Sequence, residues 1–200
     1  MTAVLSNITR PAGTVTIDTF DQLDGRLLEQ AWELYQERFD ELNSRAVQLH
    51  LMHRADFNDV MTDPRWTKYV AVDDRGDLHG LATFTNDLDA VTLISTAYFE
   101  TTMPEHYKNR RIWYIGFMAI APAGQAQHTF TRFGKAMYDA ATANNGVIAM
   151  DFCRYNLDEL RLAKIIEMVL WRIAREDGRT ATAEELDTQA YYLFEFPDAT

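Results

Sequence analysis

Arg111-Ile-Trp-Tyr-Ile-Gly-Phe-Met-Ala-Ile-Ala-Pro122 opens the stretch of sequence that decides the fold. A polar link at residues 123–128, a helix-like run at 129–143 and a second apolar run at 147–152 follow it. Residues 112–120 are apolar on both faces and rich in β-branched and aromatic side chains, which is typical of a covered central strand. A strand, a helix and a strand predict a right-handed crossover between parallel strands. The turn after the first strand then opens onto a helix N-terminus, where phosphates and other anions commonly bind.

The composition is that of an ordinary globular protein, with 47% hydrophobic and 24% charged residues among 200. The net charge of −11 argues against a nucleic-acid partner, because phosphate binding needs a basic face. Cys153 is the only cysteine, so an internal disulfide is impossible and a reducing compartment is favoured. The sequence shows neither a signal peptide nor a long apolar run, so we expect a cytoplasmic protein without a membrane segment.

Hydrophobic periodicity predicts the remaining elements. We expect a flexible lead-in at residues 1–12 and a single domain at 13–200. Strands are predicted at 14–18, 67–73, 78–84 and 189–196, and a turn at 74–77 joins two of them into a hairpin. Amphipathic helices are predicted at 20–39, 44–61 and 157–175, with Asp18 or Thr19 capping the first and Asn156 the last. Residues 86–109 are ambiguous, with a strand at 91–99 and a loop over the sheet at 101–109 as one interpretation.

This order of elements predicts one α/β domain with a mixed sheet. Over most of the chain the order resembles the GNAT superfamily of N-acyltransferases. The resemblance implies a mixed, splayed β-sheet flanked by helices on both faces. It also implies acetyl-CoA or another acyl-CoA as co-substrate, in the gap between the strands at 112–120 and 147–153. The pyrophosphate would then lie at the N-terminus of the intervening helix.

The family's phosphate loop reads Arg or Gln, two residues, Gly, one residue, then Gly or Ala. The helix length before Gly146 aligns this pattern with residues 125–130. Gln125 fits the first position, but His128 and Phe130 replace the two small residues, and their Cβ atoms obstruct the approach of the main chain to a phosphate. A later alignment at 131–136 restores Gly and Ala, but it loses the Arg or Gln and leaves too short a helix. The acyl-CoA-binding residues implied by the resemblance are Phe117, Met118, Ala119, Ile120, Gln125, Ala126, Gln127, His128 and Asn156.

Acyl transfer to an amine needs a base, an acid for the thiolate and hydrogen-bond donors for the oxyanion. Glu100 and His106 are candidate bases because a loop at 101–109 would overhang the acceptor. Tyr155 and Tyr192 are candidate acids. Solvated side chains, or a core position for one tyrosine of the last strand, are the simpler alternative. Gly116 marks either a bulge beside the oxyanion donors or relief of crowding.

The leading hypothesis is an N-acyltransferase, with acetyl as the expected group, that acts on a small-molecule or peptide amine. The acidic surface favours a cationic amine. The substitutions in the phosphate loop motivate the alternative, a non-catalytic GNAT-like binding or assembly module that has lost CoA binding. The exposed aromatic residues indicate either a homodimer or a lined pocket. No metal site is predicted, since His50, His53 and Asp56 lack a fourth ligand.

Overall fold

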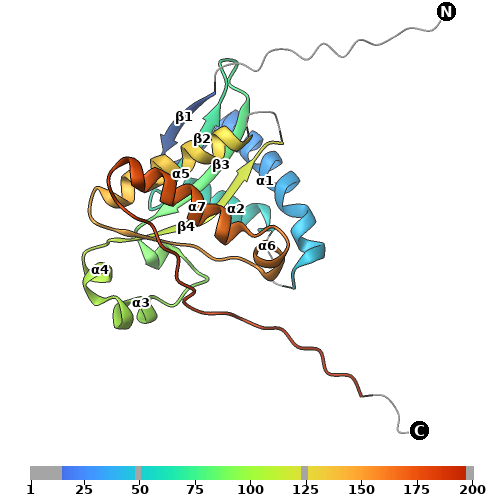
Figure 1. Cartoon of the computed structure of the whole chain (residues 1–200). Coiled ribbons are helices and arrows are strands. Elements are labelled where there is room, and N and C mark those ends of the chain that lie inside the picture. The colour runs from blue at the N-terminus through green and yellow to red at the C-terminus, as the bar shows by residue number, and fades with distance from the viewer. Residues whose placement is uncertain (1–14, 48–50, 123–125, 197–200) are drawn as a thin grey trace, which may run out of the picture.

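The computed structural model describes residues 15–47, 51–122 and 126–196. Within these residues, five strands form one sheet in the order β1-β2-β3-β4-β5 (Figure 1). The strands are β1 (Thr16–Phe20), β2 (Thr67–Val72), β3 (Leu78–Thr85), β4 (Ile112–Ile120) and β5 (Val147–Ala149). The pairs from β1 to β4 are antiparallel, whereas β4 and β5 are parallel. The mixed sheet and the crossover predicted from residues 111–152 are therefore confirmed.

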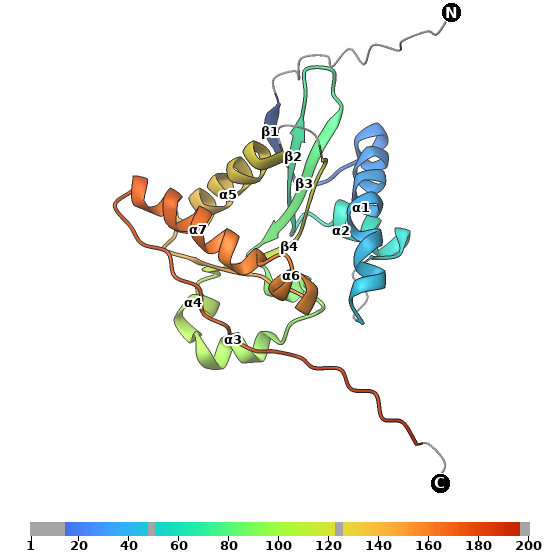
Figure 2. The same ribbon diagram turned by 45° about the vertical axis from the view of Figure 1, so that its right-hand side comes forward.

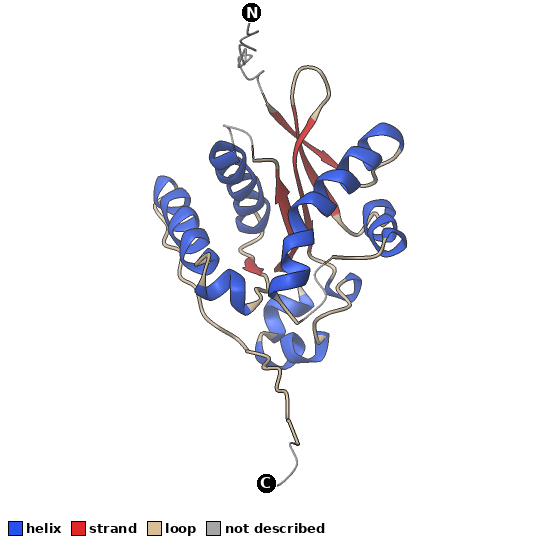
Figure 3. Cartoon of the chain, turned by 90° about the vertical axis from the view of Figure 1, so that its right-hand side faces the viewer, coloured by secondary structure: helices blue, strands red, loops and turns tan. Residues whose placement is uncertain are grey.

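Helices cover both faces of the sheet (Figure 3). Helices α1 (Gly25–Arg45) and α2 (Arg54–Thr62) lie on one face, and α5 (Ala126–Thr142) lies on the other. Helix α7 (Leu162–Glu176) packs against α5 rather than directly on the centre of the sheet. The chain between β3 and β4 forms the 3-10 helix η1 (Leu88–Ala90) and the short helices α3 (Thr96–Thr102) and α4 (Pro104–Lys108).

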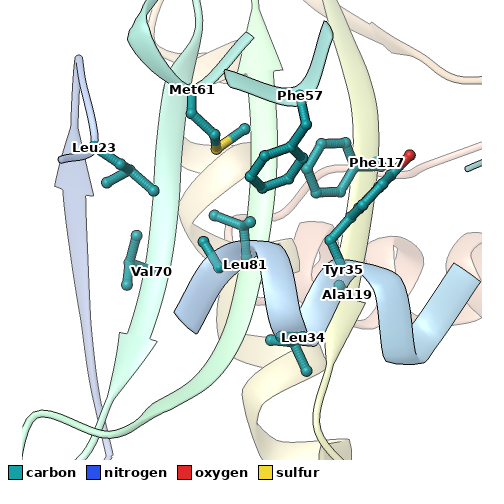
Figure 4. Packing of buried hydrophobic residues seen from close by; sticks show 10 residues of the cluster. Leu23, Leu34, Tyr35, Phe57, Met61, Val70, Leu81, Phe117 and Ala119 are labelled. Atoms are coloured by element: carbon teal, nitrogen blue, oxygen red, sulfur yellow. The ribbon is translucent and has the colours of Figure 1, made fainter. Parts of the chain in front are cut away.

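The core on the α1 side is an aromatic cluster between the helices and the sheet (Figure 4). Tyr35 of α1 lies 5.0 Å from Phe57 of α2 and 4.8 Å from Phe117 of β4, measured between ring centroids. Leu81 and Val70 extend the cluster along the neighbouring strands. This packing fixes α1 against the middle of β4, and so it positions one wall of the site described below.

The helices at the N-terminal side differ from the predicted ones in their limits. Residues 18–20 belong to β1, so Asp18 and Thr19 do not cap α1, and Asp24 occupies its N-cap position. The helix predicted at 44–61 is shorter, because α1 continues to Arg45 and α2 begins only at Arg54. The strand suggested at 91–99 is wrong, since α3 begins at Thr96 and only Phe99 of that helix is buried.

The C-terminal third differs more. The helix predicted at 157–175 is two helices, α6 (Arg154–Asp158) and α7, separated where Arg161 adopts a left-handed φ of 52°. Asn156 therefore lies inside α6, and Cys153 holds the N-cap position. The strand predicted at 189–196 is wrong, because this segment has no regular structure and its side chains are exposed. No helix of the described residues is both long enough and apolar enough to cross a membrane.

Candidate active site

The two parallel strands separate soon after they meet. β4 and β5 pair at Ile112↔Val147, Trp113↔Ile148 and Tyr114↔Ala149. β5 then ends, whereas β4 continues to Ile120. The sheet is thus splayed beyond Tyr114, and a gap bordered by the second half of β4 opens between the two strands.

A bulge in β4 borders this gap. Thr83 of β3 pairs with Phe117 and Phe84 pairs with Ile115, so Gly116 is the extra residue. A Cβ atom on Gly116 would lie 2.6 Å from the Thr83 hydroxyl oxygen and 2.9 Å from the Trp66 ring. Close packing against these two side chains therefore requires glycine here. The predicted bulge is confirmed, and the crowding that it relieves involves Thr83 and Trp66.

The bulge determines which main-chain groups face the gap. The N–H of Phe117 donates to the Thr83 hydroxyl oxygen over 3.2 Å, and the N–H of Ala121 donates to the carbonyl of His79 over 2.9 Å. Both point toward β3. Because successive N–H groups of a strand alternate in direction, those of Met118 and Ile120 point toward the gap. They are the donors that the site offers to an oxyanion or an amide.

Apolar side chains line the gap on the side of α5 and α7. They surround a cavity of about 30 Å³. Its lining consists of Ile115, Met118, Phe130, Gly134, Met137, Ile148, Met150, Ile166, Val169 and Leu170. The cavity is small, so a longer apolar ligand enters only if side chains such as Phe130 rotate away.

A buried tyrosine and a carboxylate join the two strands at the start of the gap. The Tyr114 hydroxyl donates a hydrogen bond to Asp151, which follows β5. Tyr114 is 4% exposed, whereas Asp151 is exposed. Burial, together with the negative charge and the hydrogen bond of Asp151, raises the pKa of Tyr114. The tyrosine therefore stays protonated and holds the carboxylate in place.

Helix α6 follows directly and reaches α1. The Arg45 guanidinium at the end of α1 lies over the Tyr155 ring, 5.6 Å from its centroid. Tyr155 and Asn156 are half-buried in α6. The chain that carries Asp151 thus continues into a helix that contacts α1, and Tyr155 lies four residues after the carboxylate in sequence.

The other predicted site residues lie on other elements of the chain. Glu100 is exposed on α3, and His106 is half-buried on α4, where its carbonyl accepts from the N–H of Arg111. Both helices precede the start of β4, where β4 and β5 are still paired. The loop predicted at 101–109 is helical instead. Tyr192 is 81% exposed in the C-terminal segment and lies on no strand.

The predicted phosphate-loop residues lie where β4 leads into α5. Ala126, Gln127 and His128 form the first turn of α5, and Gln127 and His128 are exposed there. Gln125 lies outside the described residues. A helix N-terminus of this kind offers N–H groups to an anion. Phe130 is half-buried and lines the gap.

The path of the chain is that of solved N-acetyltransferases. The ribosomal-protein-alanine N-acetyltransferase from Brucella melitensis biovar Abortus 2308 superimposes with a TM-score of 0.52 at 13% identity, covering 90% of this chain and 100% of the other. The aminoglycoside N-acetyltransferase AAC(6')-Iy in complex with CoA gives 0.52 at 13% identity, covering 92% and 97%. The fold is GNAT-like. At such identities the likeness concerns the fold alone. No family model and no curated protein matches the sequence.

Sequence reasoning missed the Tyr114–Asp151 pair. Tyr114 lies in the predicted strand at 112–120, in which only residues 116–120 were assigned to the site, and Asp151 was included in the second apolar run. An acidic residue at the end of an otherwise apolar strand was the available signal, because such a carboxylate is expected to be partnered or functional.

Proposed function

We propose that this chain is an N-acyltransferase that moves an acyl group, expected to be acetyl, from acyl-CoA to an amine. The observation that carries the proposal is the splayed β4–β5 pair, whose gap combines inward main-chain N–H groups with the Tyr114–Asp151 pair at its start. The gap on the α5 side is lined by apolar side chains, which suits the arm of the acyl donor.

Two groups of residues would hold the donor. The N–H groups of Met118 and Ile120 are available to the arm and to the thioester oxygen. The first turn of α5, from Ala126 to His128, offers its N–H groups to the pyrophosphate. The cavity of about 30 Å³ is smaller than the arm, so donor binding would require Phe130 and its neighbours on α7 to move.

Asp151 is the residue best placed to handle the amine. Its exposed carboxylate attracts a cationic amine and accepts the proton that the ammonium group must lose. The neutral nitrogen then attacks the thioester carbonyl, the new C–N bond forms, and the C–S bond breaks. The nitrogen gives up its surplus proton to solvent as the amide forms, and the thiolate leaves with the electron pair of the C–S bond and takes a proton to give free CoA. Tyr155, in the helix after Asp151, remains the candidate acid for that step.

Calorimetric titration of the protein with acetyl-CoA tests the donor, and an amine-dependent release of CoA thiol tests the transfer. We expect Asp151→Asn to lower kcat/KM about 10²–10⁴-fold, the usual contribution of a positioned base. Tyr114→Phe should lower kcat/KM less than Asp151→Asn does, because the carboxylate loses the hydroxyl group that positions it but still accepts the proton.

Asp158→Asn is the matched control, since Asp158 is an exposed carboxylate on α6 that pairs with Arg154 over 3.4 Å. It should leave the rate nearly unchanged. If millimolar acetyl-CoA gives no heat of binding, acetyl-CoA is not the donor. If Asp151→Asn and Asp158→Asn react at equal rates, Asp151 is not the base.

A second function is favoured by the small cavity and by Phe130 in its lining. In that case the chain is a GNAT-like binding or assembly module without CoA chemistry. Phe130→Gly combined with His128→Gly separates the two. If the natural protein binds no acetyl-CoA and the double variant does, the module is supported. If the natural protein acylates amines, the module is excluded.

A further inference from the structure

The C-terminal segment exposes an unusual amount of apolar surface. Residues 178–196 contain neither helix nor strand, and Tyr192, Leu193 and Phe196 are 81%, 86% and 91% exposed. The rings of Tyr192 and Phe194 lie 6.4 Å apart on one side of the chain. Segments that remain solvated have few aromatic residues, so this composition indicates a segment that packs against a partner.

The helix end directs this segment away from its own domain. Gly178 has a φ of +68°, its N–H donates to Arg175, and the N–H of Arg179 donates to Ala174. This pattern is a Schellman motif, which ends the helix and fixes the exit of the chain. Ala181 then packs against the cluster of Tyr138, Ile173 and Ala174. Figures 1 and 2 show the segment leaving the domain past α3.

The outer face of α7 also exposes apolar side chains, and the Arg175 guanidinium lies over the Trp171 ring, 4.7 Å from its centroid. Ile165, Met168 and Trp171 recur every three residues and are 39%, 52% and 42% exposed. Exposed basic side chains accompany them, namely Lys164 and Arg172 within α7 and Arg161 at its N-cap position. None of these three forms an ion pair with any residue in the described part of the chain. We call these six residues the α7 face.

The segment and the α7 face are complementary in polarity and charge. Exposed carboxylates accompany the apolar residues of the segment, at Glu184, Glu185, Asp187 and Glu195. One chain thus carries both an acidic, aromatic segment and a basic, apolar helix face. Because the segment exits away from its own domain, the second copy is the occupant that lets both surfaces be covered.

We propose that residues 184–196 of one copy pack on the α7 face of a second copy, and reciprocally, to form a two-fold homodimer. A reciprocal exchange closes the assembly at two chains. The apolar side chains cover Ile165, Met168 and Trp171, and the carboxylates approach the basic flank. This inference does not depend on acyl transfer.

Sedimentation equilibrium of three full-length variants tests the proposal. Tyr192→Asp with Phe194→Asp alters the segment alone, and Met168→Glu alters the α7 face alone. Each should weaken the dimer at least about tenfold, since each places charge in a buried apolar contact. Val47→Glu is the control, because Val47 is 78% exposed after the end of α1, belongs to neither proposed surface and should leave the dimer intact.

Mixing the segment variant, Tyr192→Asp with Phe194→Asp, and the helix variant, Met168→Glu, gives the decisive result. One retains an intact α7 face and the other an intact segment, so the mixture should form heterodimers with one remaining contact. A monomeric natural protein, or a dimer that survives both changes, overturns the proposal. Failure of the mixture to associate overturns it too, since it indicates pairing of like surfaces. If Met168→Glu does not fold, Lys164→Glu with Arg172→Glu replaces it, because both side chains are exposed.

Discussion

Lys68 lies in β2 with its ammonium group surrounded by main-chain carbonyls. The side chain is fully buried, and Nζ donates to the carbonyls of Asp21, Asp63 and Trp66 over 2.6, 2.6 and 2.9 Å. All three ammonium protons are thereby used, which is how a buried charge is tolerated. The residue ties the loop before α1 and the loop after α2 to the sheet.

The pH dependence of stability should reveal this lysine. Burial lowers the pKa of Lys68 to about 8, whereas an unfolded lysine keeps its proton to about 10.5. Between these values the unfolded chain binds more protons, so the free energy of unfolding should rise from pH 8 toward 10. Above pH 10 the trend reverses, because burial raises the pKa of Tyr35 to about 12 and the unfolded tyrosine ionises first.

Urea unfolding of the natural protein and of Lys68→Met between pH 7 and 9.5 measures this effect. The variant should be less stable by roughly 1–3 kcal/mol at pH 7, because buried carbonyls lose their donor. It should also lack the rise with pH. Parallel pH profiles for the two proteins would contradict the assignment of the rise to Lys68.

Gly116 and Gly134 form a matched pair for a second prediction. Gly116→Ala should destabilise the protein by about 1–3 kcal/mol, because the added methyl would clash with Thr83 and Trp66. Gly134 lies inside α5, where an added Cβ would meet its nearest neighbour at 3.6 Å, an ordinary contact. Gly134→Ala should therefore stabilise by about 0.5–1 kcal/mol. Thermal unfolding checks both signs, and equal shifts would show that the bulge is not tightly packed.

For single residues, the sequence predicts a bulge in a strand better than it predicts which side chains contact each other. Gly116 was predicted to mark either a bulge or relief of crowding, and the register of β3 and β4 shows the bulge. Glu100 was a candidate base because a loop at 101–109 would overhang the acceptor, but the segment forms helices, and Phe99 of α3 packs in the same cluster as Tyr114. The Tyr114–Asp151 contact joins residues 37 positions apart, and only the pairing of β4 with β5 brings them together.

Among the elements, α1 and α2 are attached to the sheet by a cluster of buried aromatic side chains. Phe57 of α2 is fully buried, with its ring 5.1 Å from Trp32, 5.0 Å from Tyr35 and 6.2 Å from Phe117. Helix α2 is short, so its stability comes from this packing more than from its own hydrogen bonds.

Phe57→Ala should therefore cost about 3–5 kcal/mol, the usual loss for a buried phenylalanine. Val47→Ala should change the stability by less than about 0.5 kcal/mol, because Val47 is 78% exposed. Chemical unfolding of both variants gives the comparison. A loss below about 1 kcal/mol for Phe57→Ala would mean that α2 contributes little to the cooperative core.

Elements were predictable where one physical factor dominates. Residues 112–120 were correctly interpreted as a covered strand because their apolar run is continuous on both faces. Residues 91–99 contain the same kinds of residue, but burial of Phe99 against the start of β4 favours a short helix instead. Residues 189–196 have the composition of a strand, but they pair with no strand of the described sheet and so form none.

At the scale of the whole molecule, the net charge of −11 acts on both substrates of the proposed reaction. The field attracts a cationic amine and repels the polyanionic acyl-CoA. Salt at physiological strength screens this field within about 8 Å. The two substrates should therefore respond to salt in opposite directions.

Raising the ionic strength from about 0.02 to 0.3 M, across which the Debye length falls several-fold, should raise the KM for a diamine acceptor. The KM for acetyl-CoA should fall or stay constant, because repulsion between like charges weakens. A neutral-headed amine measured at high pH is the control, and its KM should change least. If salt raises both KM values equally, local contacts at α5 and Asp151 govern encounter, and the global field has no part in selecting the acceptor.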